Sequence, residues 1–135
     1  MHIDGGCFCE AIRYKAEIDP AQISICHCTD CQTFTGSAFR TTVIVPDHQA
    51  IRIIRGEPNI FVKTADNGNR SAQHFCGACG SPLFFSNADD PKDQWGIRWG
   101  SVDQRAALKP VRQIWCASAV PWLDQISALP GRPGD

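Results

Sequence analysis

Eight cysteines carry most of the chemical information in this sequence, and seven of them fall into three close groups. The groups are an N-terminal pair (Cys7 and Cys9), a triplet (Cys26, Cys28 and Cys31) and a C-x-x-C pair (Cys76 and Cys79), while Cys116 stands alone. Short spacings of this kind are typical of thiolate ligands of zinc. We therefore interpret the seven grouped cysteines as metal ligands rather than as disulfide partners.

The two pairs and the triplet can be combined in two ways. In the first, the N-terminal pair and the C-x-x-C pair complete a closed four-cysteine site, and the triplet forms a separate site with one open position. In the second, Cys28 and Cys31 join the C-x-x-C pair as an ordinary zinc ribbon, and the remaining three cysteines are left without a complete site. The spacing favours the first combination and leaves the second open.

The local geometry of each group suits a tetrahedral metal ion. In a strand, residues i and i+2 point to the same face, so each C-x-C segment is expected to present two sulfurs side by side. Two sulfurs on one zinc lie roughly 3.8 Å apart, given a Zn–S distance of about 2.3 Å. The C-x-x-C pair is predicted to lie in a turn, in which Gly77 and Gly80 can take a positive φ. A redox-active C-x-x-C would need a βαβ setting that this sequence lacks.

Composition limits the class of protein. A chain of 135 residues with 43% hydrophobic and 20% charged residues is long enough for one globular domain and too apolar for a disordered segment. Its net charge of -1 argues against a nucleic-acid-binding protein, which usually presents a basic face. We find no membrane-spanning run and no signal peptide in the opening residues MHIDGGCFC. We therefore expect a cytoplasmic protein, whose thiols stay reduced.

The segments that position the cysteines have the alternation of short strands. Residues 11–18 alternate apolar and charged side chains, which is typical of a half-buried strand. Similar runs predict further strands at residues 23–28, 37–45, 50–56, 60–64, 71–76, 82–86, 95–103 and 111–118. A short helix is expected only at residues 122–129. The pattern predicts one all-β domain over residues 1–129, a sandwich or a partly open barrel, followed by a frayed tail at residues 130–135.

Five segments together resemble a known family. They are GGCFCEAIRY, CHCTDCQTFTGSAF, FCGACGSPLFF, GSVD and IWCASAVPWL, in this order along the chain. In order and spacing they resemble the glutathione-dependent formaldehyde-activating enzyme family, which also includes centromere protein V. The resemblance implies a β-tent sandwich related to zinc ribbons, and it implies two bound zinc ions.

The resemblance also implies a role for each grouped cysteine. The N-terminal pair and the C-x-x-C pair fall on the family's structural zinc ligands, and the triplet falls on its catalytic zinc ligands. The resemblance therefore favours the combination of a closed four-cysteine site with a separate triplet. One position departs from the family, because the glycine that usually follows the second cysteine of the N-terminal pair is Glu10 here.

An open zinc site with three thiolates indicates thiol chemistry. Three thiolates and one Zn²⁺ sum to a single negative charge, so the ion is a weak Lewis acid and prefers a soft fourth ligand such as a thiol. A thiol held as thiolate can add to an aldehyde, which gives an S-hydroxymethyl adduct. We therefore predict a zinc-dependent carbon–sulfur lyase-type enzyme acting on a thiol–aldehyde adduct, such as the S-(hydroxymethyl)glutathione that the resemblance implies. Its partners would be a small-molecule thiol and an aldehyde, with no nucleic acid and no membrane.

Two other interpretations stay open at the level of sequence. A zinc-stabilised module that binds thiols, or serves as an adaptor without turnover, would carry the same cysteines. Alternatively, both zinc ions are structural, and His27, Asp30 or another residue is the fourth ligand at the triplet.

Residues around the triplet are candidates for supporting roles. His27 is expected to point away from Cys26 and Cys28 in a regular strand, with either a structural role or a catalytic one in proton transfer. Asp30 is expected in a turn, which it would orient through its backbone, with the alternative that it takes a proton from an incoming thiol. Residues 35–37 are predicted to line the loop beside the open position.

More distant residues are interpreted mostly as structural. Arg40 and Arg98 are expected to be solvated strand residues, with the binding of substrate carboxylates as the alternative. The four tryptophans are predicted to pack in the core and at its edges, and His74 is predicted to be structural. Cys116 is interpreted as a buried strand residue, since free cysteine behaves as a small hydrophobe, with an extra metal ligand as the alternative.

Overall fold

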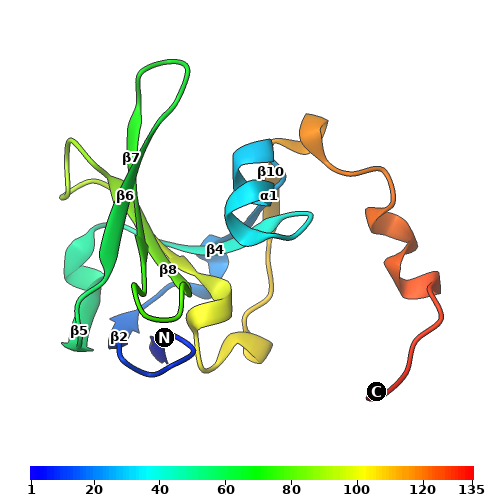
Figure 1. Ribbon diagram of the computed structural model, residues 1–135, viewed down its shortest axis with the longest axis horizontal. Helices are drawn as coiled ribbons and strands as arrows, with labels where there is room; N and C mark the ends of the chain where they lie inside the picture. The colour runs from blue at the N-terminus through cyan, green and yellow to red at the C-terminus, as the bar shows by residue number, and fades with distance from the viewer.

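The protein folds into two β-sheets that pack against each other, with one short α-helix (Figure 1). The computed structural model describes all of residues 1–135. The smaller sheet is antiparallel, with its strands in the order β1 (His2–Gly6), β2 (Arg13–Glu17) and β5 (Ile51–Arg55). This architecture confirms the predicted all-β class.

The larger sheet has seven strands, and their spatial order differs from their order in the sequence. From one edge to the other they are β10 (Arg112–Ile114), β3 (Ile23–Cys26), β4 (Arg40–Val45), β9 (Trp95–Arg98), β8 (Pro82–Asn87), β7 (Arg70–Phe75) and β6 (Asn59–Thr64). Neighbouring strands are antiparallel, except that β10 and β3 are parallel. The triplet therefore begins at the end of an interior strand, β3, which is covered on both edges.

Each predicted strand segment contains a strand, and the differences have local causes. The strands predicted at residues 95–103 and 111–118 end earlier, at Arg98 and Ile114. The sequence pattern misses β1, because its two glycines are poor strand formers. Gly5 makes room for a core side chain, since a Cβ at this position would lie 2.3 Å from the ring of Tyr14.

The helix α1 (Thr29–Thr35) is not expected from the sequence pattern. The remaining helical segments are short 3₁₀ helices: η1 (Pro20–Gln22), η2 (His48–Ala50), η3 (Trp99–Ser101), η4 (Arg105–Ala107), η5 (Cys116–Ser118) and η6 (Leu123–Ala128). The helix expected at residues 122–129 is therefore the 3₁₀ helix η6. None of these helices has the length and apolar character needed to cross a lipid bilayer.

The core lies between the two sheets. Ile3 and Tyr14 from the smaller sheet meet Val43, Phe84 and Ile97 from the larger one, and all five side chains are buried. The rings of Tyr14 and Phe84 meet edge to face, with their centroids 4.9 Å apart. Because side chains alternate along a strand, the opposite face of β4, β8 and β9 is left free to build a site.

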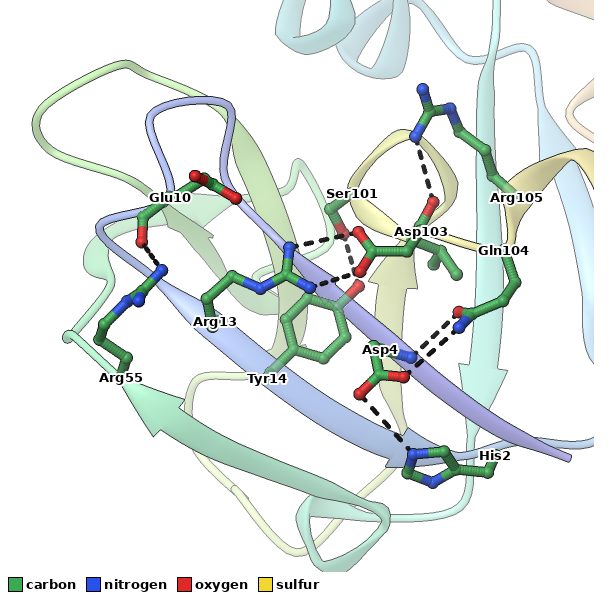
Figure 2. Close-up of polar contacts among 11 residues, drawn as sticks. His2, Asp4, Glu10, Arg13, Tyr14, Arg55, Ser101, Asp103, Gln104 and Arg105 are labelled. Carbon is green, nitrogen blue, oxygen red and sulfur yellow. Dashed lines mark hydrogen bonds and ion pairs between the residues drawn. The ribbon is translucent and has the colours of Figure 1, made fainter.

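A polar network ties the smaller sheet to the segment that follows β9 (Figure 2). Arg13 forms a bidentate ion pair with Asp103, and the hydroxyl of Tyr14 lies 2.7 Å from the hydroxyl of Ser101. The backbone N–H of Asp4 donates to the side-chain oxygen of Gln104 at 3.0 Å. These contacts fix the GSVD segment, residues 100–103, against β1 and β2.

After β10 the chain runs away from the two packed sheets (Figure 1). Residues 115–129, here called the C-terminal arm, lie apart from the two sheets, and none of their side chains is buried. Trp115 and Trp122 are exposed, contrary to the prediction, whereas Trp95 and Trp99 pack against the core. The prediction that Cys116 is a buried strand residue is also wrong, because Cys116 begins η5 and is exposed.

Candidate functional site

The N-terminal pair and the C-x-x-C pair lie together in the folded chain. Their four Sγ atoms all lie within 4.8 Å of one another, and no other side chain joins them. The Sγ of Cys9 is 3.7 Å from that of Cys7 and 3.8 Å from that of Cys76. These distances match the separation of about 3.8 Å between two sulfurs on a tetrahedral zinc. The donor set therefore fits a closed zinc site.

The N-terminal pair is presented by a tight turn rather than by the expected strand. β1 ends at Gly6, and the backbone N–H of Glu10 donates to the carbonyl of Cys7 at 3.1 Å. The N–H of Ile12 donates to the Sγ of Cys7 at 3.2 Å, a bond that stabilises a thiolate. Glu10 has a φ of 64°, in the left-handed region. The glycine that is usual at this position would take this conformation without strain.

The C-x-x-C pair occupies the turn between β7 and β8. Gly80 has a φ of 78°, and its N–H donates to the carbonyl of Cys76 at 2.8 Å. The residue after the second cysteine is thus left-handed in both turns. The prediction of a positive φ for Gly77 is wrong, and a Cβ there would instead meet the side chain of Asn59 at 2.5 Å.

Ser81 links these two turns. Its hydroxyl accepts a hydrogen bond from the N–H of Phe8 at 3.0 Å and lies 3.2 Å from the Sγ of Cys79. Hydrogen bonds from Ser81 lower the pKa of Cys79 to about 5. A thiol with this pKa is deprotonated at neutral pH, as a metal ligand must be.

The triplet lies where β3 runs into α1. Cys26 is the last residue of β3, Cys28 is the N-cap of α1, and Cys31 lies in the first turn of the helix. Their Sγ atoms lie within 4.8 Å of one another, and all three residues are half-buried. A helix replaces the turn expected around Asp30, because the Sγ of Cys28 accepts the N–H of Cys31 at 3.3 Å and so caps the first turn.

The three thiols of the triplet differ in acidity. Burial raises the pKa of Cys26, and burial together with the two neighbouring thiols raises the pKa of Cys31 to about 12. Burial alone would raise the pKa of Cys28. The pKa is nevertheless lowered, because the N–H of Cys31, the neighbouring thiols and the positive charge of Lys63 together outweigh burial. Thiols this close do not all ionise unless a cation lies among them. The donor set therefore fits a metal ion.

The triplet has no fourth protein ligand. Neither His27 nor Asp30 belongs to the group. The ring of His27 is buried, with its Nε2 2.9 Å from the Oε1 of Gln113 and no partner at its Nδ1. The carboxylate of Asp30 forms an ion pair with Lys63. One position of a tetrahedral ion at the triplet would therefore be open to a small molecule.

A cavity of about 190 Å³ adjoins the triplet. It lies over the face of the larger sheet that points away from the core, and α1 borders it. Besides Cys26 and Cys31, the side chains that matter for its chemistry are Phe34, Arg40, Lys63, Gln73 and Arg98. The cavity therefore combines two sulfurs of the triplet with three basic side chains, Arg40, Lys63 and Arg98.

Of residues 35–37, predicted to lie beside the open position, Thr35 and Ser37 line a different cavity. Gly36 ends α1 with a φ of 63°, and Thr35 and Ser37 line a second cavity of about 700 Å³. That cavity includes the ion pair of Arg13 with Asp103 drawn in Figure 2, but no residue of the triplet. The loop touches the triplet through Thr35, whose hydroxyl donates to the carbonyl of Cys31 at 2.9 Å.

Arg40 and Arg98 are buried, so the expectation that they are solvated is wrong. Their exposed fractions are 5% and 7%. Both guanidinium groups donate to the Oε1 of Gln73, at 3.2 Å from Arg40 and 2.7 Å from Arg98. Burial and the charge of Arg40 lower the pKa of Arg98. Sequence reasoning also missed Gln73 and Lys63, because their strands meet the triplet only in the folded chain.

His74 is structural, as predicted. It is buried, its Nε2 lies 3.0 Å from the hydroxyl of Ser86, and its ring packs against that of Trp95 with centroids 4.8 Å apart. Burial and the charge of Arg98 lower the pKa of His74 to about 4, so the ring is neutral at pH 7. It therefore adds no further positive charge behind the cavity.

Comparison with known proteins agrees with this geometry. The model of the family described as glutathione-dependent formaldehyde-activating enzyme matches residues 2–118. The chain belongs to this family. The matched residues include both sheets and all three cysteine groups, and they leave out most of the C-terminal arm.

Two further proteins are similar to this family member. A protein of Schizosaccharomyces pombe called an uncharacterized lyase is 28% identical over 83 residues, which make up 62% of this chain and 56% of that protein. This chain thus spans about half the length of that relative. A crystal structure of a Rhodobacter sphaeroides protein matches with a TM-score of 0.58 and 20% identity, over 82% of this chain and 98% of the other, and it shows a shared fold. At the level of the family, these findings support an enzyme of the lyase type.

Proposed function

We propose that this protein is a zinc-dependent carbon–sulfur lyase-type enzyme that forms or cleaves an adduct between a thiol and an aldehyde. The observation that carries the proposal is the triplet, with three sulfurs within 4.8 Å of one another, no fourth protein ligand and a cavity beside them. The family name supports S-(hydroxymethyl)glutathione, the adduct of glutathione and formaldehyde, as a representative substrate. The seven grouped cysteines would hold two zinc ions, one at each site.

The proposed reaction is an addition without oxidation or reduction. The sulfur of the thiol bonds to the carbonyl carbon, the π electrons of the C=O bond move to oxygen, and the proton lost by the thiol ends on that oxygen. The reverse reaction breaks the C–S bond and regenerates thiol and aldehyde. Zinc, when bound by Cys26, Cys28 and Cys31, would supply a soft cationic centre that favours the deprotonated form of a thiol at neutral pH.

The residues of the chain hold and orient this site. The N–H of Cys31 and the charge of Lys63 favour the thiolate form of Cys28. We propose that His27 is a positioning residue, because its ring contacts Gln113 in β10 and its carbonyl accepts a hydrogen bond from the side chain of Gln32 in α1 at 2.9 Å. It would thereby fix the loop that carries the first two ligands.

We propose the cytoplasm as the place of this activity, because thiols stay reduced there. The partners would be small molecules, a thiol and an aldehyde. The C-x-x-C pair and the N-terminal pair would bind the second zinc in a purely structural role, since their four sulfurs leave no open position.

The rate of exchange between formaldehyde and its thiol adduct tests the proposal. Exchange NMR with ¹³C-formaldehyde and glutathione measures the forward and reverse rates together. We expect zinc-loaded protein to exceed the spontaneous rate and Cys28→Ser to lose this acceleration. Cys116→Ser is the matched control, because Cys116 is exposed and lies outside both cysteine sites. Thiol binding without any acceleration at stoichiometric protein would contradict an enzyme and favour a thiol-binding module.

A further inference from the structure

The cavity beside the triplet contains two positive charges that no carboxylate offsets. Arg40 and Arg98 are both more than nine-tenths buried, and neither forms a salt bridge. Lys63 also lines the cavity, but it is already paired with Asp30. Buried charges in proteins are normally paired with an opposite charge. Apart from the triplet and Asp30, which is paired with Lys63, no acidic side chain lines the cavity, so it leaves a place for one further anionic group beside the two arginines.

One edge of the Arg40 guanidinium has no partner. Its Nη1 donates to Gln73, whereas its Nε is buried without an acceptor and its Nη2 donates to no protein atom. Adjacent N–H groups of a guanidinium form the fork that binds both oxygens of a carboxylate. Arg40 lies over the ring of Phe34 at 5.4 Å, and Arg98 lies over the ring of Phe85 at 4.8 Å. These contacts hold both planar groups in place.

The cavity is small for a binding site. Its volume of about 190 Å³ is below the roughly 300–1,000 Å³ of sites that take drug-sized ligands. The larger cavity of about 700 Å³ also reaches Arg40 and Arg98, but it contains none of the three cysteines. A ligand whose sulfur lies at the triplet therefore meets the arginines after a short chain, and a longer ligand would have to extend past them, out of this cavity.

We propose that Arg40 and Arg98 form a carboxylate subsite, and that the thiol taken by this protein is a short mercaptocarboxylate such as 3-mercaptopropionate. This inference rests on the proposed function, because it takes the triplet as the place of the thiol. The carboxylate accepts hydrogen bonds from the free edge of Arg40 and from Arg98, which Thr42 and Gln73 hold in position. A purely electrostatic role, in which the arginines only offset the thiolate charges, would give no preference for an acidic thiol.

Binding to the zinc-loaded protein, measured by isothermal titration calorimetry, tests the subsite. The probes are 3-mercaptopropionate, its neutral isostere 3-mercaptopropionamide, and glutathione. We expect the acid to bind about 10-fold or more tightly than the amide, since a charge-assisted pair is lost in the amide. We also expect it to bind more tightly than glutathione. Equal affinities for acid and amide would overturn the carboxylate subsite, and tighter binding of glutathione would overturn the assignment to a short thiol.

Variants identify the residue responsible. Arg40→Gln is expected to reduce the preference for the acid over the amide to about 2-fold or less. Arg40→Lys keeps the charge and lacks the fork, so an intermediate preference is expected. The control is Arg70→Gln, because Arg70 is exposed and paired with Asp89 outside the cavity. Retention of the full preference in either Arg40 variant would overturn the role of the fork.

A measurement on the wild type separates this inference from the proposed function and does not depend on any variant. Propionate, which has no sulfur, is added to ¹⁵N-labelled zinc-loaded protein, and the Nε–H resonances of arginine are followed by NMR. We expect saturable shifts for Arg40 and Arg98 and none for Arg70. If propionate shifts them but no thiol binds, the proposed function fails and the subsite stands. If thiols bind without preference and propionate shifts neither arginine, the subsite fails and the proposed function stands.

Discussion

At the scale of single residues, the two turns of the four-cysteine site use the same backbone conformation. The residue after the second cysteine is left-handed in both, with a φ of 64° at Glu10 and 78° at Gly80. Its N–H closes the turn on the carbonyl of Cys7 in one case and of Cys76 in the other. The left-handed region costs a residue with a side chain about 1–2 kcal/mol, which glycine avoids. Glu10 therefore carries backbone strain that Gly80 does not.

We expect Glu10→Gly to raise the free energy of unfolding of the zinc-loaded protein by about 0.5–1 kcal/mol. The relief of left-handed strain exceeds the entropy that glycine adds to the unfolded chain. The matched change Gly80→Ala should lower the free energy of unfolding by about 1 kcal/mol. A Cβ at Gly80 would meet nothing within 4 Å, so its effect reports the backbone alone. Urea unfolding followed by tryptophan fluorescence measures both, and a destabilised Glu10→Gly would contradict this reading.

Single residues differ in how far the sequence predicts them. The seven grouped cysteines could be predicted, because the spacing of metal ligands is a local property of the chain. The burial of Arg40 and Arg98 could not, because it depends on Gln73, which lies 33 residues from one and 25 from the other in sequence. Only the order of strands in the larger sheet brings these three side chains together.

At the scale of elements, the two cysteine sites hold different parts of the fold. The four-cysteine site joins the turn after β1, in the smaller sheet, to the turn between β7 and β8, in the larger sheet. The triplet joins β3 only to α1, the helix that follows it directly. Loss of the first site should therefore loosen the whole fold, whereas loss of the second should be a local event.

We expect Cys9→Ser to abolish the cooperative unfolding transition and Cys28→Ser to leave the far-UV circular dichroism spectrum unchanged. A structural zinc site contributes about 10–16 kcal/mol in small zinc-dependent peptides, which is as large as the total stability of a typical domain. Circular dichroism during thermal unfolding measures both variants. A Cys9→Ser protein that unfolds cooperatively near the wild-type temperature would contradict a stabilising role for this site.

The elements themselves were predictable where a periodic pattern marks them. Alternation predicts all the strands except β1, in which Gly5 is required by the Tyr14 ring rather than by strand propensity. α1 could not be predicted, because its N-cap is Cys28 rather than one of the usual capping residues, and the segment before it continues the pattern of β3. The two-sheet arrangement follows from the core between the sheets, which single-strand patterns do not specify.

At the scale of the whole molecule, the family match and both sites lie within residues 2–118. We propose that residues 1–129 constitute one domain, with residues 130–135 as its tail. The C-terminal arm differs from the rest of this domain, because its Trp115, Trp122 and Leu129 are exposed. Neither cysteine site includes a residue of this arm, so the candidate metal ligands all lie in β3, in α1 with its N-cap, and in the turns after β1 and between β7 and β8.

The amount of zinc per chain tests the central claim most directly, namely that the cysteines form one closed four-sulfur site and one separate open triplet. Inductively coupled plasma mass spectrometry on purified full-length protein measures it. We predict about two zinc ions per chain in the wild type and about one in Cys28→Ser, with Cys116→Ser unchanged at two. A single zinc-ribbon site made of Cys28, Cys31, Cys76 and Cys79 would instead give about one zinc in the wild type and none in Cys28→Ser, and that result would contradict the division.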